Sequence, residues 1–188
     1  MSGIGHNGGP GNGDGFLRHC WRMARRELIG GGGTLPIEVV RARVARAKAL
    51  GLDYKTYAGV RATTGRDLVA FLYSSNALGV FRPGQVIADA PLLRLQASAA
   101  QPHLGLSGRA LPGLLDQIAA KSELALPRFG TNWGEMRDDL KAWLMAQGLP
   151  GDAVLMIGET DHERELMTAG GLAGFISGQS FLGAGAGR

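Results

Sequence analysis

The chain has 188 residues, of which 45% are hydrophobic and 19% are charged, and its formal net charge is +4. A chain of this length buries enough surface to fold as one globular domain, alone or with a small appendage, without a disulfide or a metal ion. Its one cysteine, Cys20, excludes an internal disulfide and every metal site that needs several cysteines.

The sequence shows neither a membrane span nor a secretory signal. Its longest apolar runs are far shorter than the roughly 18 residues that a spanning helix needs. The opening residues, MSGIGHNGGPGNGDG, lack a basic cluster followed by an apolar stretch. Together with the single cysteine, which a reducing compartment keeps as a thiol, these features predict a cytoplasmic protein without a membrane partner.

Basic residues are concentrated in the first third of the chain. Residues 16–66 hold eleven Lys or Arg and three acidic residues, a net charge of +8, whereas the segment from residue 67 onward carries −3. This asymmetry predicts an acidic partner, a nucleic acid or a protein, for residues 16–66. The alternative is that arginine, a good helix former, covers solvated helix faces there.

The first third also predicts helices between glycine-rich ends. We expect residues 1–15 and 183–188 to be disordered tails, because they hold too few apolar side chains to offset chain entropy. Residues 16–66 form the predicted basic helical segment. Its three helices cover residues 16–29, run from Pro36 to Gly51, and run from Asp53 to about Thr64. The second of them has an apolar stripe formed by Ile37, Val40, Val44 and Ala47.

From residue 67 the hydrophobic pattern becomes that of an α/β domain, which we expect over residues 67–182. Residues 68–73 and 153–157 are continuous apolar runs, as in strands that are buried on both faces. A shorter run covers residues 172–176, and residues 103–107 are a weaker fourth candidate. Helical patterns lie between these runs, at 89–99, 110–121, 133–147 and 161–169. The alternation predicts a small parallel sheet flanked by helices, a three-layer, Rossmann-like arrangement.

Polar residues follow two of the predicted strands. Because ligands of parallel sheets bind at the carboxyl ends of the strands, we expect the two main runs to lie side by side and to open on one crevice. The candidate ligand-binding residues there are Ser74, Ser75, Asn76, Glu159, Thr160 and Asp161. The alternative is ordinary capping, in which Thr160 or Asp161 caps the helix at 161–169, and Glu163 suits its first turn.

These strand ends resemble the haloacid dehalogenase superfamily over about residues 67–178. Ser74-Ser75-Asn76 resembles its second motif, an apolar strand that ends in Ser or Thr. The stretch VLMIGETDHERELMTAGGLAGFI, from residue 154, resembles its fourth motif, with Glu159 in place of the usual first Asp. The resemblance implies Asp161 or Glu163 as the later acid of that motif, and Arg128 or Lys121 as a basic third-motif residue.

The chain lacks the residue that carries the chemistry of that superfamily. Its members attack with an Asp in an early Asp-x-Asp motif, and no such motif stands in this sequence. Without a carboxylate nucleophile no covalent aspartyl intermediate forms. We therefore expect a non-catalytic or weakly catalytic relative that binds a small anion or a protein partner at the strand ends. Mg²⁺ is a possible cofactor but is not favoured, because few carboxylates converge.

A second resemblance concerns the whole chain. Its opening, MSGIGHNGGP, and the stretch LGLDYKTYAGVRATTGRDLVAFLYSSNAL are similar to those of small uncharacterised bacterial proteins. That likeness brings no activity with it.

The competing interpretation is nucleic-acid binding. The stretch RAKALGLDYKTYAGVRATTG, residues 46–65, resembles a helix-turn-helix, with Ala47 at the helix crossing and Gly51 in the turn. Arg46 at a normally apolar position and Gly59 in the second helix weaken the pattern. Candidate contacts are Arg43, Lys48, Tyr54, Lys55, Thr56 and Arg61, with the last four expected to face outward. The alternative is that both helices pack on the sheet.

Overall fold

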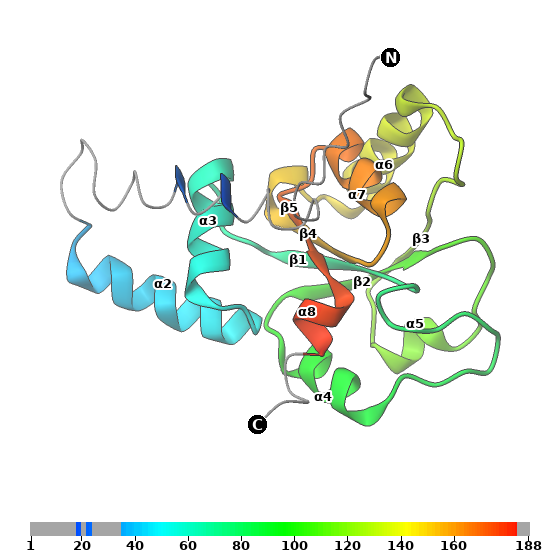
Figure 1. Ribbon diagram of the computed structural model, residues 1–188, viewed down its shortest axis with the longest axis horizontal. Coiled ribbons are helices and arrows are strands. Elements are labelled where there is room, and N and C mark those ends of the chain that lie inside the picture. The colour runs from blue at the N-terminus through cyan, green and yellow to red at the C-terminus, as the bar shows by residue number, and fades with distance from the viewer. Residues whose placement is uncertain (1–17, 20–21, 24–34, 184–188) are drawn as a thin grey trace, which may run out of the picture.

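The computed structural model describes residues 18–19, 22–23 and 35–183. A five-stranded parallel sheet lies at its centre, with strand order β3-β2-β1-β4-β5. The α/β fold class predicted from the sequence is confirmed (Figure 1). The strands are β1 (Ala70–Ser74), β2 (Gln101–Leu106), β3 (Glu123–Ala125), β4 (Val154–Gly158) and β5 (Gly174–Ser177).

The two main apolar runs lie side by side at the middle of the sheet, as expected. β1 pairs with β4 in parallel, with Ala70 opposite Val154. Every residue of both strands is buried. Alternate side chains enter two separate cores, so Phe71 points to one face of the sheet and Leu72 to the other. Both faces are therefore covered, which explains why these strands read as unbroken apolar runs.

Helices form a layer on each face of the sheet (Figure 1). On one face lie α6 (Trp133–Gln147) and α7 (Asp161–Gly170), which bury Leu140 and Leu166. The other face is covered by α4 (Asp89–Ala97), α5 (Leu114–Gln117) and α8 (Gly178–Leu182), together with the inner ends of α2 (Ile37–Leu50) and α3 (Tyr54–Thr64). None of the described helices is long and apolar enough to cross a membrane.

Several predicted elements differ from the structure. The helix predicted over 110–121 is confined to α5, because Gly113, with φ +83°, precedes it and Ala119, with φ +49°, follows it. The weak candidate at 103–107 is a full strand, β2, and β3 was not predicted at all. The predicted helix at 16–29 and the predicted tails lie outside the described residues, apart from 18–19, 22–23 and 183.

The apolar stripe predicted for α2 is only partly buried. Ala47 and Leu50 enter the core, whereas Ile37 is 61% exposed and Val44 is 46% exposed. The reason is that the helix meets the body of the molecule only through its last turns, and its first turns project away from the sheet (Figure 1).

Asp67, just before β1, connects α2 and α3, the two basic helices, to the start of the central strand through hydrogen bonds. Its Oδ2 accepts from Arg46 Nε on α2 at 2.9 Å, and its Oδ1 accepts from the Tyr57 hydroxyl on α3 at 2.8 Å. The backbone N–H of Leu68 also donates to Oδ1 at 2.9 Å. We call Asp67, Arg46, Tyr57 and the Leu68 amide the Asp67 cluster. Burial and the hydrogen bond to Asp67 raise the pKa of Tyr57 above its ordinary value.

The α6 face of the sheet contains a buried histidine. His103 on β2 is 1% exposed, and its Nδ1 lies 2.9 Å from the Ser122 hydroxyl. Trp143 Nε1 donates to the same hydroxyl at 3.2 Å, and the Trp143 ring meets the imidazole edge to face. Burial, and to a lesser degree Lys121, lower the pKa of His103. The imidazole therefore packs as a neutral core group.

Candidate functional site

The two serines at the end of β1, Ser74 and Ser75, are buried, and their hydroxyl oxygens accept hydrogen bonds from backbone amides near the strand ends. Ser74 is fully buried, and its Oγ accepts from the Ala77 amide at 3.0 Å. Ser75 is 1% exposed, and its Oγ accepts from the Ser107 amide at 3.1 Å, which joins the end of β1 to the end of β2. Among the described residues, no histidine or carboxylate bonds either hydroxyl, so neither serine has the base that a nucleophile requires.

Glu163, in the first turn of α7, is the buried acid of this region. It is 1% exposed, and its Oε1 accepts from Asn76 Nδ2 and from Ser107 Oγ, both at 3.0 Å. Its Oε2 accepts from the backbone amides of Glu159 at 2.7 Å and Thr160 at 2.9 Å. We call these five residues the Glu163 cluster. One carboxylate thus joins the ends of β1, β2 and β4 through four neutral donors.

The cluster grows out of a local helix cap. Thr160 Oγ1 accepts from the Glu163 amide at 3.2 Å, and Glu163 returns the bond to Thr160, which completes a capping box. The capping alternative for Thr160 is therefore confirmed. The two amides that bond to the Glu163 carboxylate, those of Glu159 and Thr160, lie just before α7, and the Glu163 amide is bonded to Thr160 Oγ1.

The carboxylates of the two other acids predicted at this site, Glu159 and Asp161, are directed elsewhere. Glu159 Oε2 accepts from the Gln179 amide at 3.3 Å. The Asp161 side chain is 89% exposed and lies 3.7 Å from Arg164 Nε. Among the described residues, no group of three or more His, Cys, Asp or Glu could hold a metal ion. These residues do not fit Mg²⁺, which prefers convergent carboxylates with open coordination positions.

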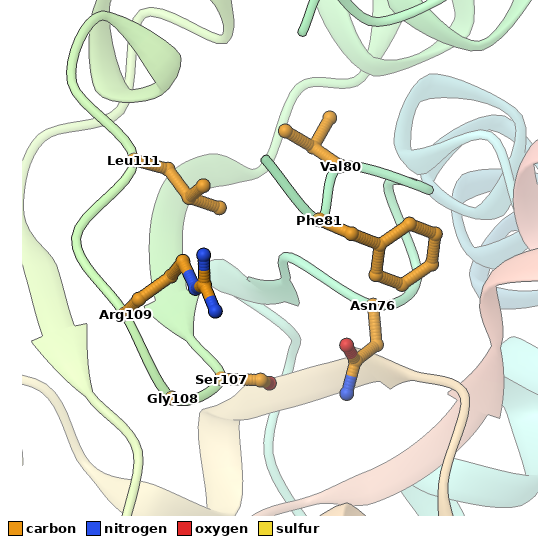
Figure 2. Close-up of a pocket in the computed structure, with 7 residues that line it drawn as sticks. All are labelled: Asn76, Val80, Phe81, Ser107, Gly108, Arg109 and Leu111. Atoms are coloured by element: carbon orange, nitrogen blue, oxygen red, sulfur yellow. The ribbon is translucent and has the colours of Figure 1, made fainter. Parts of the chain in front are cut away.

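A hollow of about 370 Å³ opens beside the Glu163 cluster. We call it the strand-end hollow; its lining is Asn76, Val80, Phe81, Ser107, Gly108, Arg109 and Leu111. Figure 2 shows that the Arg109 guanidinium points into it, on the same side as Leu111 and across from Phe81. Within the described chain, Arg109 has no acidic partner within 4 Å, and the Gly108 and Arg109 amides donate to no protein acceptor.

A smaller hollow of about 180 Å³ shares Asn76, Ser107 and Gly108 with the first. Its lining also includes Glu163, His162 and Arg128, the last being one of the two basic residues that the resemblance suggested. His162 Nε2 lies 2.8 Å from the Pro127 carbonyl, and its ring packs edge to face with Phe129. Asn76 and Ser107 therefore line both hollows, one of which contains Arg109 and the other Arg128, while Lys121 lines neither.

The proposed nucleic-acid contacts are largely engaged within the protein. Tyr54 does not face outward as expected, because its ring packs against the core and its hydroxyl is buried. The Thr56 hydroxyl donates to Asp53 at 2.6 Å, and Arg61 Nη1 lies 3.9 Å from Asp67. Lys48 and Lys55 are exposed, and Arg43 is half-buried. Arg46, the residue that weakened the helix-turn-helix pattern, belongs to the Asp67 cluster.

Sequence reasoning missed Ser107 and Arg109 as site residues. Ser107 was read only as the end of a weak strand candidate, and it meets Glu163 across 56 positions of sequence. The available signal was the sequence Leu-Ser-Gly-Arg directly after an apolar run, a pattern like that after β1. Comparison of the chain with family models, with curated proteins and with solved structures found no match.

Proposed function

We propose that this protein is a non-catalytic, cytoplasmic relative of the haloacid dehalogenase-like proteins that binds a small anion in the strand-end hollow. The observation that carries the proposal is Arg109. Its guanidinium points into a hollow at the carboxyl ends of parallel strands and pairs with no acid in the described chain. A guanidinium presents a planar fork of donors that matches carboxylate and phosphate oxygens.

The order of the strands supports the absence of catalysis. By sequence, Ser74-Ser75-Asn76 resembles the second motif; because β1 is the first strand of the described sheet, within the resemblance these residues instead stand where the superfamily has its first motif, Asp-x-Asp. Ser107, at the end of β2, then takes the place of the second-motif Ser or Thr. Serine and asparagine replace both carboxylates under this assignment, and the Ser74 hydroxyl is bonded to a backbone amide. A covalent aspartyl step has no residue to begin from.

The Glu163 cluster favours the strand-end hollow over the N-terminus of α7 as the place where an anion binds. At that helix terminus the Glu159 and Thr160 amides are bonded to Glu163, and an anion on the neighbouring Asp161 and His162 amides would meet repulsion from this carboxylate. In the strand-end hollow the Gly108 and Arg109 amides have no acceptor in the described chain, and the Arg109 guanidinium adds a positive charge beside them. The Glu163 carboxylate therefore does not occupy the donors of Gly108 and Arg109, which remain available to a ligand.

The proposal is tested by anion binding to the full chain. Titration calorimetry with acetate and with inorganic phosphate is expected to detect saturable binding to the wild type and a loss of at least about tenfold in Arg109→Gln. The matched control is Arg82→Gln, an exposed arginine that does not line the hollow. Equal binding by Arg109→Gln and the wild type, or no saturable binding of either anion, would overturn the proposal.

A parallel assay distinguishes anion binding from the nucleic-acid alternative. If the protein binds DNA through residues 36–66, the logarithm of its DNA affinity should fall linearly with the logarithm of the salt concentration. Lys55→Ala and Arg61→Ala should also weaken its retention on DNA. We expect neither variant to change anion binding. DNA retention that depends on these two residues, together with no anion binding, would favour the alternative.

A further inference from the structure

The floor of the strand-end hollow has a fixed negative charge directly behind it. Asn76 and Ser107 line the hollow, and both donate to the same oxygen, Glu163 Oε1, at 3.0 Å. Their strongest donor groups are therefore directed away from a ligand and toward the buried carboxylate. Among the residues that line the strand-end hollow, Arg109 is the one cation, and behind the floor lies one acid that no described cation pairs within 4 Å; Arg128 lines the smaller hollow instead.

That charge balance discriminates between anions. A monoanion is attracted by the Arg109 guanidinium and repelled by the Glu163 carboxylate, each through one unit of ligand charge. A phosphate monoester dianion doubles both terms and also has to shed the hydration of a second charge. A carboxylate carries one charge and fits the guanidinium fork in a bidentate way, so its selective binding follows from the local charges.

The walls of the hollow indicate what the anionic group is attached to. Val80, Phe81 and Leu111 form the side opposite the polar floor (Figure 2). Val80 and Leu111 are buried, but Phe81 is 58% exposed beside the opening. Its ring can lose water by covering an apolar ligand body, and aromatic pairs add to simple burial. The volume of about 370 Å³ lies within the range of small-molecule pockets.

We propose that the strand-end hollow takes a monocarboxylate with an apolar, aryl-sized body, its carboxylate on Arg109 and its body against Phe81. This inference rests on the proposed function and makes it more specific. Arg109 and Phe81 in the lining and Glu163 behind the floor together disfavour two simpler ligands, a bare anion and a phosphate monoester, which should bind more weakly. Binding involves no covalent step.

The experiment compares phenylacetate with acetate and with phenyl phosphate by titration calorimetry at about pH 8, where phenyl phosphate is a dianion. We expect phenylacetate to bind the wild type at least about tenfold more tightly than either of the others. Phe81→Ala is expected to remove most of the advantage over acetate and leave acetate itself unchanged. Arg109→Gln is expected to lose phenylacetate and acetate alike, and Arg82→Gln neither.

The outcomes separate this inference from the proposed function. If acetate or phenyl phosphate binds through Arg109 as tightly as phenylacetate, the anion site stands and the monocarboxylate inference is wrong. An unchanged phenylacetate affinity in Phe81→Ala also overturns the inference. If none of the three ligands binds in an Arg109-dependent way, the proposed function falls and the inference falls with it.

Discussion

Two acidic residues organise opposite ends of the same strand, and they do so with different chemistry. Asp67 lies before β1, its side chain is 38% exposed, and it pairs with the cation Arg46 at 2.9 Å. Glu163 lies beyond the end of β1, is 1% exposed, and accepts four hydrogen bonds from neutral donors. One cluster attaches the basic helices by charge pairing, whereas the other joins strand ends without neutralising the acid.

The difference shows why only one end of the sheet is suited to a ligand. In the Asp67 cluster the cation and the acid are already paired, and the Tyr57 hydroxyl fills a further acceptor position. In the Glu163 cluster the acid is held by neutral donors alone, and Arg109, the cation that lines the strand-end hollow, pairs with no acid in the described chain and can meet an anion. Because Glu163 receives its hydrogen bonds from neutral donors, Arg109 is not needed to pair with it and can bind an external anion.

The largest expected effect comes from Glu163→Gln. Either orientation of the glutamine amide turns its NH₂ group toward two donors, so at least two buried groups lose their acceptor. We expect the free energy of unfolding to fall by about 3 kcal/mol in chemical denaturation. Glu165→Gln, on the same helix with its side chain 63% exposed, is the control and should change stability by less than about 0.5 kcal/mol. Equal effects of the two variants would contradict the role of Glu163.

Asp67→Asn should have a smaller effect, and one that salt reduces. Asparagine keeps an acceptor for Tyr57 but loses the charge that pairs with Arg46, in a partly exposed site. We expect a loss of about 1 kcal/mol, discounted for solvent screening, that shrinks at about 1 M salt. The cost of Glu163→Gln should not shrink in this way, because its partners are neutral. Glu38→Gln, which breaks an exposed pair with Arg41, is the control.

Titration of Tyr57 reports on the Asp67 cluster alone. Burial and Asp67 raise its pKa, so the unfolded chain ionises first as the pH rises, and this contribution to stability is lost above about pH 10. In Asp67→Asn we expect the pKa of Tyr57, followed by ultraviolet absorbance, to move down toward its ordinary value. Glu163→Gln should leave it in place. A Tyr57 titration that is the same in Asp67→Asn and the wild type would show that the contact is not made in solution.

The smallest effect concerns His103, which belongs to neither cluster. Because burial lowers its pKa, the unfolded chain takes up a proton before the folded chain does, and stability falls as the pH drops below about 6.5. His103→Gln, which cannot take up that proton, should lose less stability than the wild type between about pH 7 and about pH 5. An identical loss in both proteins would mean that His103 is protonated in the fold.

The fold was predictable where the signal is local. The unbroken apolar runs of β1 and β4 identified the centre of the sheet, because only strands covered on both faces lack alternation. Asp53 and Thr160 marked the starts of α3 and α7 by their capping chemistry. β3 was not predicted, because a three-residue strand at the edge of the sheet, with two exposed residues, gives no periodic hydrophobic signal.

The candidate site was predictable only in outline. Of the six predicted ligand-binding residues, Asn76 and Thr160 line the smaller hollow, whereas Ser74, Ser75, Glu159 and Asp161 line neither hollow. The role of Glu163 depends on partners up to 87 positions away, and a sequence read alone could assign it only to its own helix turn. Arg109 could not be identified either, because its lack of an acidic partner is a property of the folded surroundings.

The most direct test of the central claim is an NMR titration of the full chain with phenylacetate, observed through the backbone amides. Binding at the strand-end hollow predicts saturable shifts for Gly108 and Arg109 that disappear in Arg109→Gln and persist in Arg82→Gln. The Glu159 and Thr160 amides, bonded to Glu163, should shift little. Shifts centred on Glu159 and Thr160, or the same shifts in Arg109→Gln, would contradict the account.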